Sequence, residues 1–226
     1  MILETKKLKP FLDILLTESN FTDEEIRDEV QNFMFAGHDT TTVGISFCLY
    51  ALSNNQHVQD KLYDEIKNNL LNKDTEPTYQ SYTNMKYLDC VVKESLRIYT
   101  PVPMIARKVD EDIEVPSGYI IPKGALVNFF LIRMHNDEKY FPNPIQFKPE
   151  RFEDNLKHPY SYVPFSAGLR NCLGQKFALL EMKIVLTTLL SKYRFLPATQ
   201  VKSITLDTGI VLRSLQKVPL RIVERN

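Results

Sequence analysis

Cys172 is the residue of this chain whose neighbours best suit chemistry. It lies in the stretch Phe-Ser-Ala-Gly-Leu-Arg-Asn-Cys-Leu-Gly that begins at Phe165, and a run with helical spacing follows it. Arg170, two residues earlier, and the expected helix N-terminus would both stabilise a thiolate. Gly168 and Gly174 permit a tight turn and a close approach of the backbone to a flat ligand. These residue types suit a cysteine that ligates a metal, although a lone cysteine is more often a buried structural residue.

The stretch resembles the haem-binding loop of the cytochrome P450 family, whose pattern is Phe-x-x-Gly-x-Arg-x-Cys-x-Gly. The matching residues are Phe165, Gly168, Arg170, Cys172 and Gly174. The resemblance implies that Cys172 is the axial ligand of haem iron, where a thiolate donates electron density and favours cleavage of the O–O bond. Phe165 is placed to shield the sulfur from water. Leu169 stands where many relatives carry proline, which we expect to loosen the loop slightly without removing a ligand.

A second group of polar residues interrupts a long predicted helix. Thr22 and Glu25 form a capping box, and apolar residues with helical spacing continue from there, which predicts a helix over residues 22–53. Its middle is Ala-Gly-His-Asp-Thr-Thr-Thr from Ala36 onward, and glycine, aspartate and threonine are poor helix formers. Such a turn is either a functional site or a kink where Gly37 packs against a neighbour.

The same turn matches the P450 signature Ala/Gly-Gly-x-Asp/Glu-Thr-Thr/Ser of the helix that crosses the haem. The resemblance implies that Gly37 makes room for dioxygen and that Asp39 and Thr40 deliver protons to it. The wording here is most similar to the branch that contains the fatty-acid ω-hydroxylases, many of which carry a haem-esterifying glutamate at the position of Ala36. Alanine cannot form that ester, so the resemblance implies haem b held non-covalently apart from the Cys172 thiolate.

Glu94 and Arg97 lie three residues apart on a helix predicted over residues 84–99. Taken alone, they would be an exposed pair worth about a few tenths of a kcal/mol. They also match the family's Glu-x-x-Arg motif, and the segment Pro-Glu-Arg-Phe that contains Arg151 matches its downstream partner. The resemblance implies a buried ion network of the three side chains, which holds the fold together around the haem and takes no part in the chemistry.

Arg107 and a set of apolar residues complete the predicted site. By resemblance, Arg107 and Arg170 bind the two haem propionates, to which arginine offers a planar fork of donors. The alternative for Arg107 is a surface arginine on an edge strand. The resemblance also implies a mostly apolar cavity that takes a lipophilic substrate. The predicted lining residues are Phe33, Ala36, Thr40, Met104, Ile105, Ile210 and Val211.

The elements that must position these residues are mostly helices, with a proline-rich region between them. Nine of the thirteen prolines fall between Pro101 and Pro164, which argues against long helices there. We therefore expect a β and meander region over residues 106–160. Within it, a strand over residues 119–121 and a turn over residues 122–124 lead to a returning strand over residues 125–130.

The remaining C-terminal residues predict one helix and several hairpins. The haem loop occupies residues 165–174, a helix follows over residues 175–192, and short hairpins follow over residues 193–223. The helix residues expected to face inward are Phe177, Leu180, Ile184, Val185 and Leu189. The predicted fold is mainly α with small β-hairpins, a partial cytochrome P450 domain over residues 1–226 that corresponds to the C-terminal haem-binding portion of the family fold.

Composition excludes several other classes of protein. Lysine plus arginine equals aspartate plus glutamate at 28 each, so there is no electrostatic case for a nucleic-acid partner. Three widely spaced cysteines without a Cys-x-x-Cys pair indicate reduced thiols on the cytosolic side. The N-terminus does not resemble a signal peptide. The longest apolar run, residues 43–52, is too short to span a bilayer.

The resemblance also implies partners and a location for the complete protein. It would take electrons from an NADPH–cytochrome P450 reductase, with cytochrome b5 as a second candidate donor, at the cytosolic face of the endoplasmic reticulum membrane. Complete family members are much longer, so we expect this chain to be their C-terminal part, without an anchor of its own. Two hypotheses stay open. The intact motifs favour a haem monooxygenase acting on a fatty acid or similar lipid, and the absent half of the pocket favours an inactive fragment that binds haem weakly at most.

Overall fold

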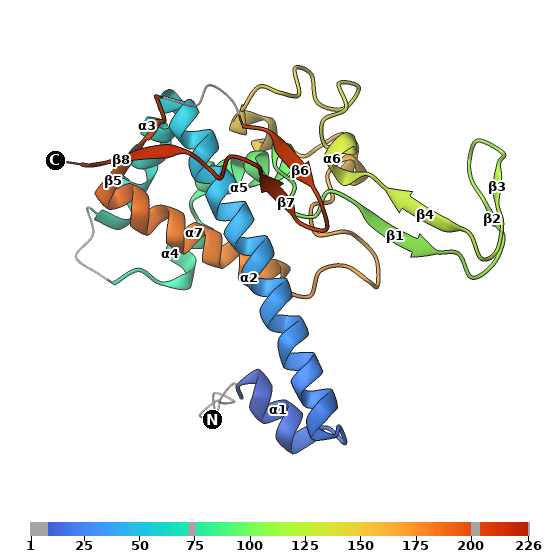
Figure 1. Ribbon diagram of the computed structural model, residues 1–226. Coiled ribbons are helices and arrows are strands. Elements are labelled where there is room, and N and C mark those ends of the chain that lie inside the picture. Colours follow the sequence, from blue (N-terminus) through green and yellow to red (C-terminus); the bar gives the residue numbers. More distant parts are fainter. Residues whose placement is uncertain (1–8, 72–75, 200–203, 226) are drawn as a thin grey trace, which may run out of the picture. The chain divides into compact units, whose positions relative to one another are not determined.

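The computed structural model describes residues 9–71, 76–199 and 204–225 of the chain (Figure 1). The chain divides into two compact units, Met1–Asp39 and Thr40–Asn226. Helix α2 (Asp23–Asn54) contributes its first turns to the N-terminal unit and its last turns to the C-terminal unit. The predicted long helix is therefore confirmed, and it continues without a break through the turn that begins at Ala36.

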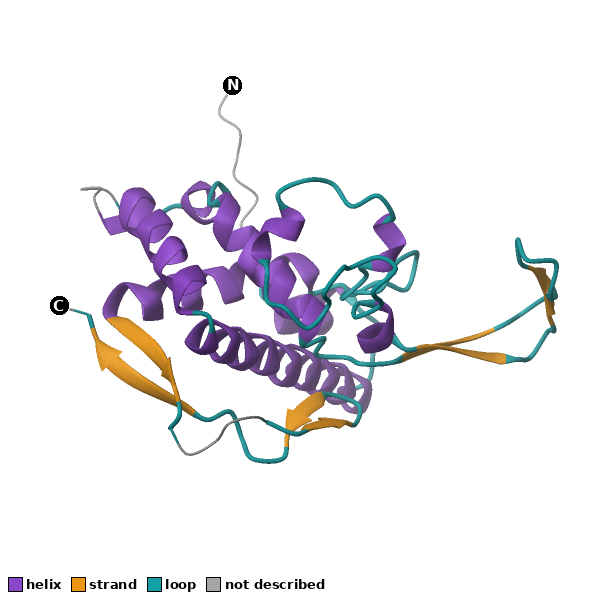
Figure 2. Cartoon of the chain, turned by 90° about the horizontal axis from the view of Figure 1, so that it is seen from above, coloured by secondary structure: helices purple, strands orange, loops and turns teal. Residues whose placement is uncertain are grey.

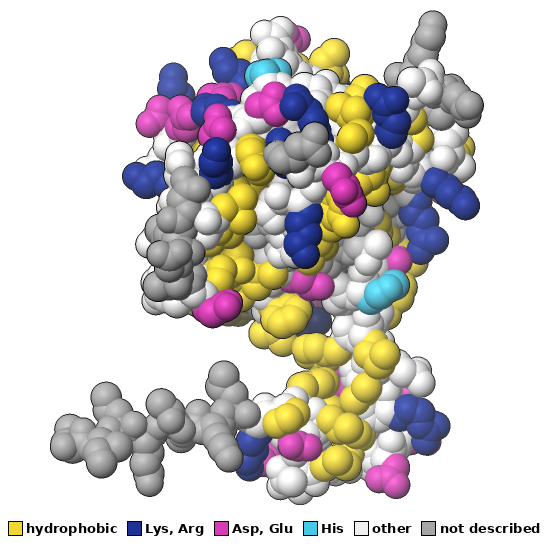
Figure 3. Space-filling view, turned by 90° about the vertical axis from the view of Figure 1, so that its left-hand side faces the viewer, with side chains coloured by type: hydrophobic (Ala, Val, Ile, Leu, Met, Phe, Trp, Pro, Cys, Tyr) yellow, Lys and Arg dark blue, Asp and Glu magenta, His cyan; other side chains and the backbone are white. Residues whose placement is uncertain are grey.

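The N-terminal unit consists of α1 (Phe11–Glu18) and the first part of α2. The predicted capping box is present, because the Glu25 amide donates to Thr22 Oγ1 at 3.3 Å and the Thr22 amide donates to Glu25 Oε2 at 2.8 Å. The rings of Phe11 and Phe33 lie 4.3 Å apart. Hydrophobic side chains nevertheless reach the surface of this unit (Figure 3). The exposed ones are Phe11, Leu12, Ile14, Leu16, Phe21, Phe33, Met34 and Phe35.

Helices form the body of the C-terminal unit. Four of its helices, α2, α3, α5 and α7, supply most of its apolar core, to which Leu52, Leu62, Val91 and Leu186 contribute fully buried side chains. The helices that follow α2 are α3 (Gln56–Ile66), which continues as a π-helical turn (Lys67–Leu71), α4 (Tyr79–Thr83), α5 (Lys86–Ile98), α6 (Leu131–Met134) and α7 (Gln175–Lys192). Two 3-10 turns, Pro149–Phe152 and Pro159–Ser161, lie in the predicted meander.

The strands of the C-terminal unit pair only two at a time in the described part of the chain. Each pair is antiparallel: β1 (Ile105–Lys108) with β4 (Leu126–Phe129), β2 (Ile113–Glu114) with β3 (Ile120–Ile121), β5 (Tyr193–Pro197) with β8 (Leu220–Glu224), and β6 (Leu206–Thr208) with β7 (Leu212–Ser214). The first two pairs form a ribbon that extends away from the helices (Figure 2). Helices dominate and the strands form small hairpins, which confirms the predicted fold class.

The pairing of the returning strand differs from the prediction. We expected the strand after residues 122–124 to return along residues 119–121, but β4 pairs with β1, and Arg107 lies opposite Val127. Gly124, at φ +86°, turns the chain so that β4 passes β3 and continues towards β1. A short alternating pattern does not determine which strand is the pairing partner. The sequence alone therefore could not distinguish pairing of β4 with β1 from pairing of β4 with β3. Residues 200–203 of the predicted hairpins lie outside the described residues.

The inward face of α7 also differs from the prediction, although its bounds are as expected. Phe177 and Ile184 are exposed, whereas the buried residues of α7 are Met182, Lys183, Leu186, Thr187 and Leu190. The buried face includes a lysine because Lys183 Nζ pairs with Asp89 Oδ1 on α5 at 2.7 Å. Gly44 on α2 lies against the same face, since a Cβ at that position would be 3.2 Å from Met182 Sδ.

The described helices include none that is both long enough and apolar enough to cross a lipid bilayer.

Candidate functional site

Cys172 lies in a tightly folded loop that ends where α7 begins. Its amide donates to the carbonyl of Phe165 at 2.8 Å, which closes the loop. Gly168 has φ +79°, a backbone conformation that only glycine adopts without strain. Ser166 also adopts a positive φ, of 62°. A backbone hydrogen bond therefore closes the loop, and the positive φ at position 168 explains why glycine suits that position.

Cys172 is the exposed cysteine of the three, whereas Cys48 and Cys90 are buried. Burial raises the pKa of Cys48 to about 12. Burial also raises the pKa of Cys90. A thiol must lose its proton to ligate a metal, so the two buried cysteines are poorly suited to that role. The structural alternative for a lone cysteine, burial in the core, thus applies to Cys48 and Cys90 and does not apply to Cys172.

Arg107 reaches from strand β1 to the Cys172 loop. Its Nη2 donates to Ser166 Oγ at 2.9 Å and to the carbonyl of Arg170 at 3.3 Å. The sequence left open whether Arg107 is a surface arginine on an edge strand. It lies on a strand of a two-stranded sheet, but its guanidinium spans to the loop and is half-buried there. Arg107 therefore ties the ribbon to the loop and brings a second cation close to Arg170.

The surface that flanks Cys172 is apolar. Leu169, Leu173 and Phe177 are all strongly exposed in the segment that carries the cysteine, while Phe165 packs against the core. The described residues include no group of three or more His, Cys, Asp and Glu side chains that could hold a metal ion. An exposed thiol among apolar side chains, with two arginines at the same loop, fits a flat apolar group that carries its own metal and anionic substituents. Haem has this chemistry.

Glu94, Arg97 and Arg151 form one ion network in the C-terminal unit. Glu94 and Arg97 both have an exposed fraction of 0%. Glu94 Oε2 accepts from Arg97 Nε at 2.8 Å, and Glu94 Oε1 accepts from Arg97 Nη2 at 2.9 Å, so the pair is bidentate. Arg151 Nε and the amide of Lys148 also donate to Glu94 Oε1, at 3.3 and 2.9 Å. The pair is therefore buried, and the alternative from sequence, an exposed surface pair, does not apply.

His135 is a buried polar residue that sequence reasoning missed. Its side chain has an exposed fraction of 0% and lies just after α6. Nδ1 lies 2.8 Å from Thr100 Oγ1, and the Val163 amide donates to Nε2 at 3.0 Å. Burial, followed by the charge of Arg97, lowers the pKa of His135 to about 3. In the sequence, His135 stands in a Met-His-Asn segment between two predicted site regions. Three residues are too short a pattern to predict a buried position or a role.

The predicted oxygen-site residues all lie on α2. Ala36, Gly37 and Asp39 belong to the N-terminal unit, and Thr40 begins the C-terminal unit. A Cβ added at Gly37 would meet no atom within 4 Å, so the described chain gives no sign of the packing kink that was the alternative. The turn is helical although it contains weak helix formers, and packing at Gly37 does not explain why the glycine is there.

The predicted substrate-pocket residues belong to both units of the chain. Phe33 contacts Phe11 in the N-terminal unit. In the C-terminal unit Ile210 is 82% exposed and its neighbour Val211 is 6% exposed, so the two side chains face opposite ways. Met104 is exposed and Ile105 is half-buried on β1. The segment of Ile210 and Val211 lies beside the segment that leads to Met104, because the Leu212 amide donates to the carbonyl of Pro101 at 2.8 Å. The cavity that these residues would line stays a prediction.

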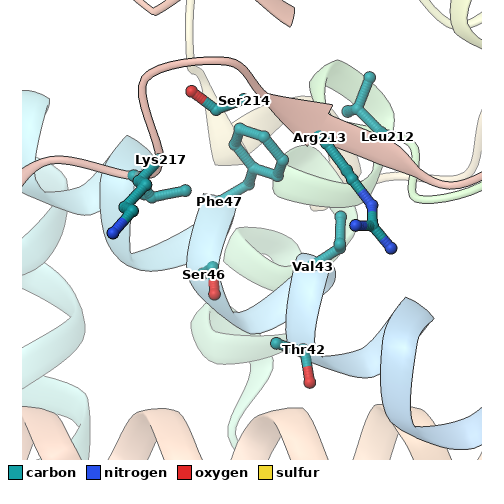
Figure 4. Close-up of a pocket in the computed structure, with 9 residues that line it drawn as sticks. Thr42, Val43, Ser46, Phe47, Leu212, Arg213, Ser214 and Lys217 are labelled. Carbon is teal, nitrogen blue, oxygen red and sulfur yellow. The ribbon is translucent and has the colours of Figure 1, made fainter. Parts of the chain in front are cut away.

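A different apolar pocket lies between α2 and strand β7 (Figure 4). Its volume is about 310 Å³. Val43, Phe47 and Leu212 give it apolar lining, and Arg213 and Lys217 lie at opposite ends of it (Figure 4). Its lining residues are Thr42, Val43, Ser46, Phe47, Leu212, Arg213, Ser214, Lys217 and Val218. On α2, Val43 and Phe47 lie three and seven residues after Thr40, which places them on the same face of the helix as Thr40. On the other segment the lining begins at Leu212, directly after Val211.

Comparison with known proteins gives one consistent family. The sequence profile described as "Cytochrome P450" matches residues 2–219 of this chain. Human "Cytochrome P450 4V2" is 41% identical over 228 aligned residues, covering 97% of this chain and 43% of the human protein. In Drosophila melanogaster, "Cytochrome P450 4d2" is 43% identical, with 97% of this chain and 45% of that protein covered. "Cytochrome P450 4ae1", from the same fly, is 46% identical, with 86% and 41% covered. The chain spans less than half the length of these relatives.

Proposed function

Because this chain belongs to the cytochrome P450 family, we propose that its protein is a haem-thiolate monooxygenase. The reaction would insert one atom of O2 into a C–H bond of a lipophilic substrate. The second oxygen atom would leave as water, and NADPH would supply the two electrons. One observation carries the proposal: Cys172 is an exposed thiol among apolar side chains, on a loop closed by the hydrogen bond from its own amide to the Phe165 carbonyl, which suits an axial ligand of haem.

Several residues of the loop would hold the haem. Cys172 would supply the thiolate, and Phe165, Gly168 and Gly174 would shape the loop around it. When bound, thiolate-ligated haem supplies the activation of dioxygen that no amino-acid side chain provides. Arg170 would pair with a propionate. Arg107 donates to the loop at Ser166 Oγ and at the Arg170 carbonyl. Its guanidinium has further N–H groups that could donate to a haem propionate.

Residues of α2 would serve the oxygen side of the haem. Thr40 would donate and accept hydrogen bonds through its hydroxyl, and Asp39 would supply and recover the proton that the hydroxyl passes on. The small side chain of Ala36 and the bare backbone of Gly37 would leave room beside them. These roles come from the match to the family signature, and Ala36 would leave the haem free of the ester bond that a glutamate could form.

We propose a fatty acid or a similar lipid as substrate. The names of the relatives place them in the P450 4 group. The resemblance of this sequence to the branch that contains the fatty-acid ω-hydroxylases supports the proposal. The electron donor would be an NADPH–cytochrome P450 reductase, with cytochrome b5 as a second candidate. The complete protein would then work at the cytosolic face of the endoplasmic reticulum membrane, where such donors and lipid substrates meet.

The test replaces the proposed ligand in the complete natural protein and compares it with a buried cysteine. We expect Cys172→Ala to abolish the red-shifted Soret band of the reduced carbon monoxide complex. Cys90→Ala, which removes a buried thiol from a small apolar cluster, should keep that band. If Cys172→Ala retains the band, Cys172 is not the ligand, and if the unmodified protein lacks it, the proposed function is wrong.

A further inference from the structure

We propose that His135 is a positioning residue for the Cys172 loop, acting as a neutral imidazole whose Nε2 accepts the Val163 amide. Neither the family motifs nor the predicted site includes this histidine. The inference rests on the proposed function in one respect, because the purpose of the fixed loop is to present Cys172 to haem. The hydrogen bonds that define the role are present in the chain itself.

The partners of the ring determine its tautomer. A backbone amide can only donate, so the Val163 amide at 3.0 Å requires a bare lone pair on Nε2. A neutral ring then carries its proton on Nδ1, which donates to Thr100 Oγ1 at 2.8 Å. The Thr100 hydroxyl in turn donates to the carbonyl of Leu96 at 3.0 Å or of Arg97 at 3.2 Å. Every polar atom of this fully buried ring is satisfied in one protonation state.

A short chain of hydrogen bonds leads from His135 to the cysteine. Val163 is held by the ring through its amide, and its carbonyl accepts from the Ser166 amide at 2.9 Å. Phe165, between these two residues, accepts the amide of Cys172 at 2.8 Å. The imidazole therefore fixes the point where the chain enters the loop, two residues before the carbonyl that closes it.

The same residue is tied to the ion network through its backbone. Arg97 Nη1 donates to the carbonyl of His135 at 2.8 Å, so the buried arginine holds the main chain from which the imidazole projects. The ring of Tyr162 packs against the imidazole at 5.3 Å between centroids. His135 thus connects α5, the turn after α6 and the Cys172 loop, and transmits the position of the Glu94–Arg97 pair to the loop.

Two substitutions separate the halves of the ring. His135→Gln can place an oxygen near the position of Nε2 and keep the bond from Val163, whereas His135→Asn can place a donor near Nδ1 and keep only the bond to Thr100. His57→Asn, at an exposed position of α3, is the matched control. Two measurements apply to each protein: exchange of the Val163 amide in the haem-free state, and the fraction of thiolate-ligated haem in the complete natural protein at equal haem content.

We expect His135→Asn to exchange the Val163 amide about tenfold faster, as the loss of one buried hydrogen bond implies, and to lose most of the thiolate-type carbon monoxide band. His135→Gln and His57→Asn should stay within about threefold of the unmodified protein in exchange and keep the band. Equal behaviour of the Gln and Asn variants, or a Gln variant that fails to fold, would overturn the proposal. So would a ¹⁵N shift showing a proton on Nε2 in the unmodified protein. If the unmodified protein lacks the thiolate band, the proposed function fails, while the exchange measurement still decides the role of His135.

Discussion

Glu94 shows at the scale of one residue how burial decides the effect of a charge. The carboxylate has no exposed surface and accepts from two arginines and one backbone amide. Glu94→Ala would leave Arg97 charged and buried without its partner. We expect the free energy of unfolding to fall by about 3–5 kcal/mol and haem content to fall with it. Denaturant unfolding and the haem-to-protein ratio measure both effects.

The control for Glu94 lies one residue away on the same helix. Lys93 pairs with Asp89 at 2.6 Å, but both side chains are partly exposed. Lys93→Ala should therefore change the free energy of unfolding by less than about 1 kcal/mol. If Glu94→Ala has the same small effect and haem binding stays normal, the network makes no structural contribution.

Thr40 supports a prediction about chemistry at the same scale. If its hydroxyl passes the proton as proposed, Thr40→Ala should consume NADPH without a matching yield of product, and peroxide should take the place of the missing product. Thr83→Ala, at an exposed position of α4, is the control. NADPH consumption, product and peroxide are measured together in the complete natural protein. Unchanged coupling in Thr40→Ala would remove Thr40 from the mechanism.

Some individual residues could be predicted from the sequence, and others could not. Cys172 stood out because its neighbours suit a thiolate, and Glu94 and Arg97 because they match a motif. His135 carried no such pattern, since its partners Thr100 and Val163 lie 35 and 28 residues away. A buried polar residue whose partners are distant in sequence becomes visible only when the fold brings them together.

Gln59 acts at the scale of elements, where it joins α3 to strand β5. The side chain is fully buried, and its Oε1 accepts the Phe195 amide at 2.9 Å. Its Nε2 donates to the Phe195 carbonyl at 2.8 Å, which Gln56 Nε2 also reaches at 2.8 Å. Among these bonds, the Phe195 carbonyl accepts from both glutamines, whereas the Phe195 amide donates to Gln59 alone.

We expect Gln59→Leu to leave the Phe195 amide unpaired and to lower the free energy of unfolding by about 1–3 kcal/mol. Exchange of that amide should accelerate, because it would lose its hydrogen-bond acceptor on α3. Gln80→Leu, at an exposed position of α4, should change stability by no more than about 0.5 kcal/mol. Slow exchange at Phe195 in Gln59→Leu would show that protection of this amide does not depend on Gln59.

Helices were predicted better than the contacts between elements. The long apolar pattern of α2 and the bounds of α7 followed from periodicity, because helical spacing is a local property. The buried face of α7 did not, since apolar residues occupy more than one side and Lys183 is buried through its pair with Asp89. Strand pairing failed for a similar reason, because β1 and β4 are joined by a longer connection than β2 and β3.

Exposed apolar surface is the feature that matters at the scale of the whole molecule. In the N-terminal unit Met34 is 68% exposed and Phe35 is 58% exposed, and similar side chains line α1. Surface of this kind favours association with another apolar surface. It is also the observation that favours the second hypothesis, a chain that is inactive by itself.

We expect residues 1–226 alone to aggregate or self-associate and not to sustain turnover. The measurement is to express this chain, supply haem and a reductase, and assay hydroxylation of a medium-chain fatty acid alongside light scattering. The double variant Met34→Gln, Phe35→Gln should stay monomeric to a higher concentration, because it removes exposed apolar surface without changing charge. A soluble monomer with one haem per chain and sustained hydroxylation would contradict the prediction.

The uneven exposure of the three cysteines has a practical consequence. A maleimide dye or mass tag should attach to the folded, haem-free protein at Cys172, since Cys48 and Cys90 are buried. The label would then be attached at one known position of the loop. If Cys172 ligates haem, bound haem should protect the Cys172 sulfur from reaction with the reagent. Intact-mass spectrometry of a labelled sample would therefore give the fractions of haem-loaded and haem-free protein.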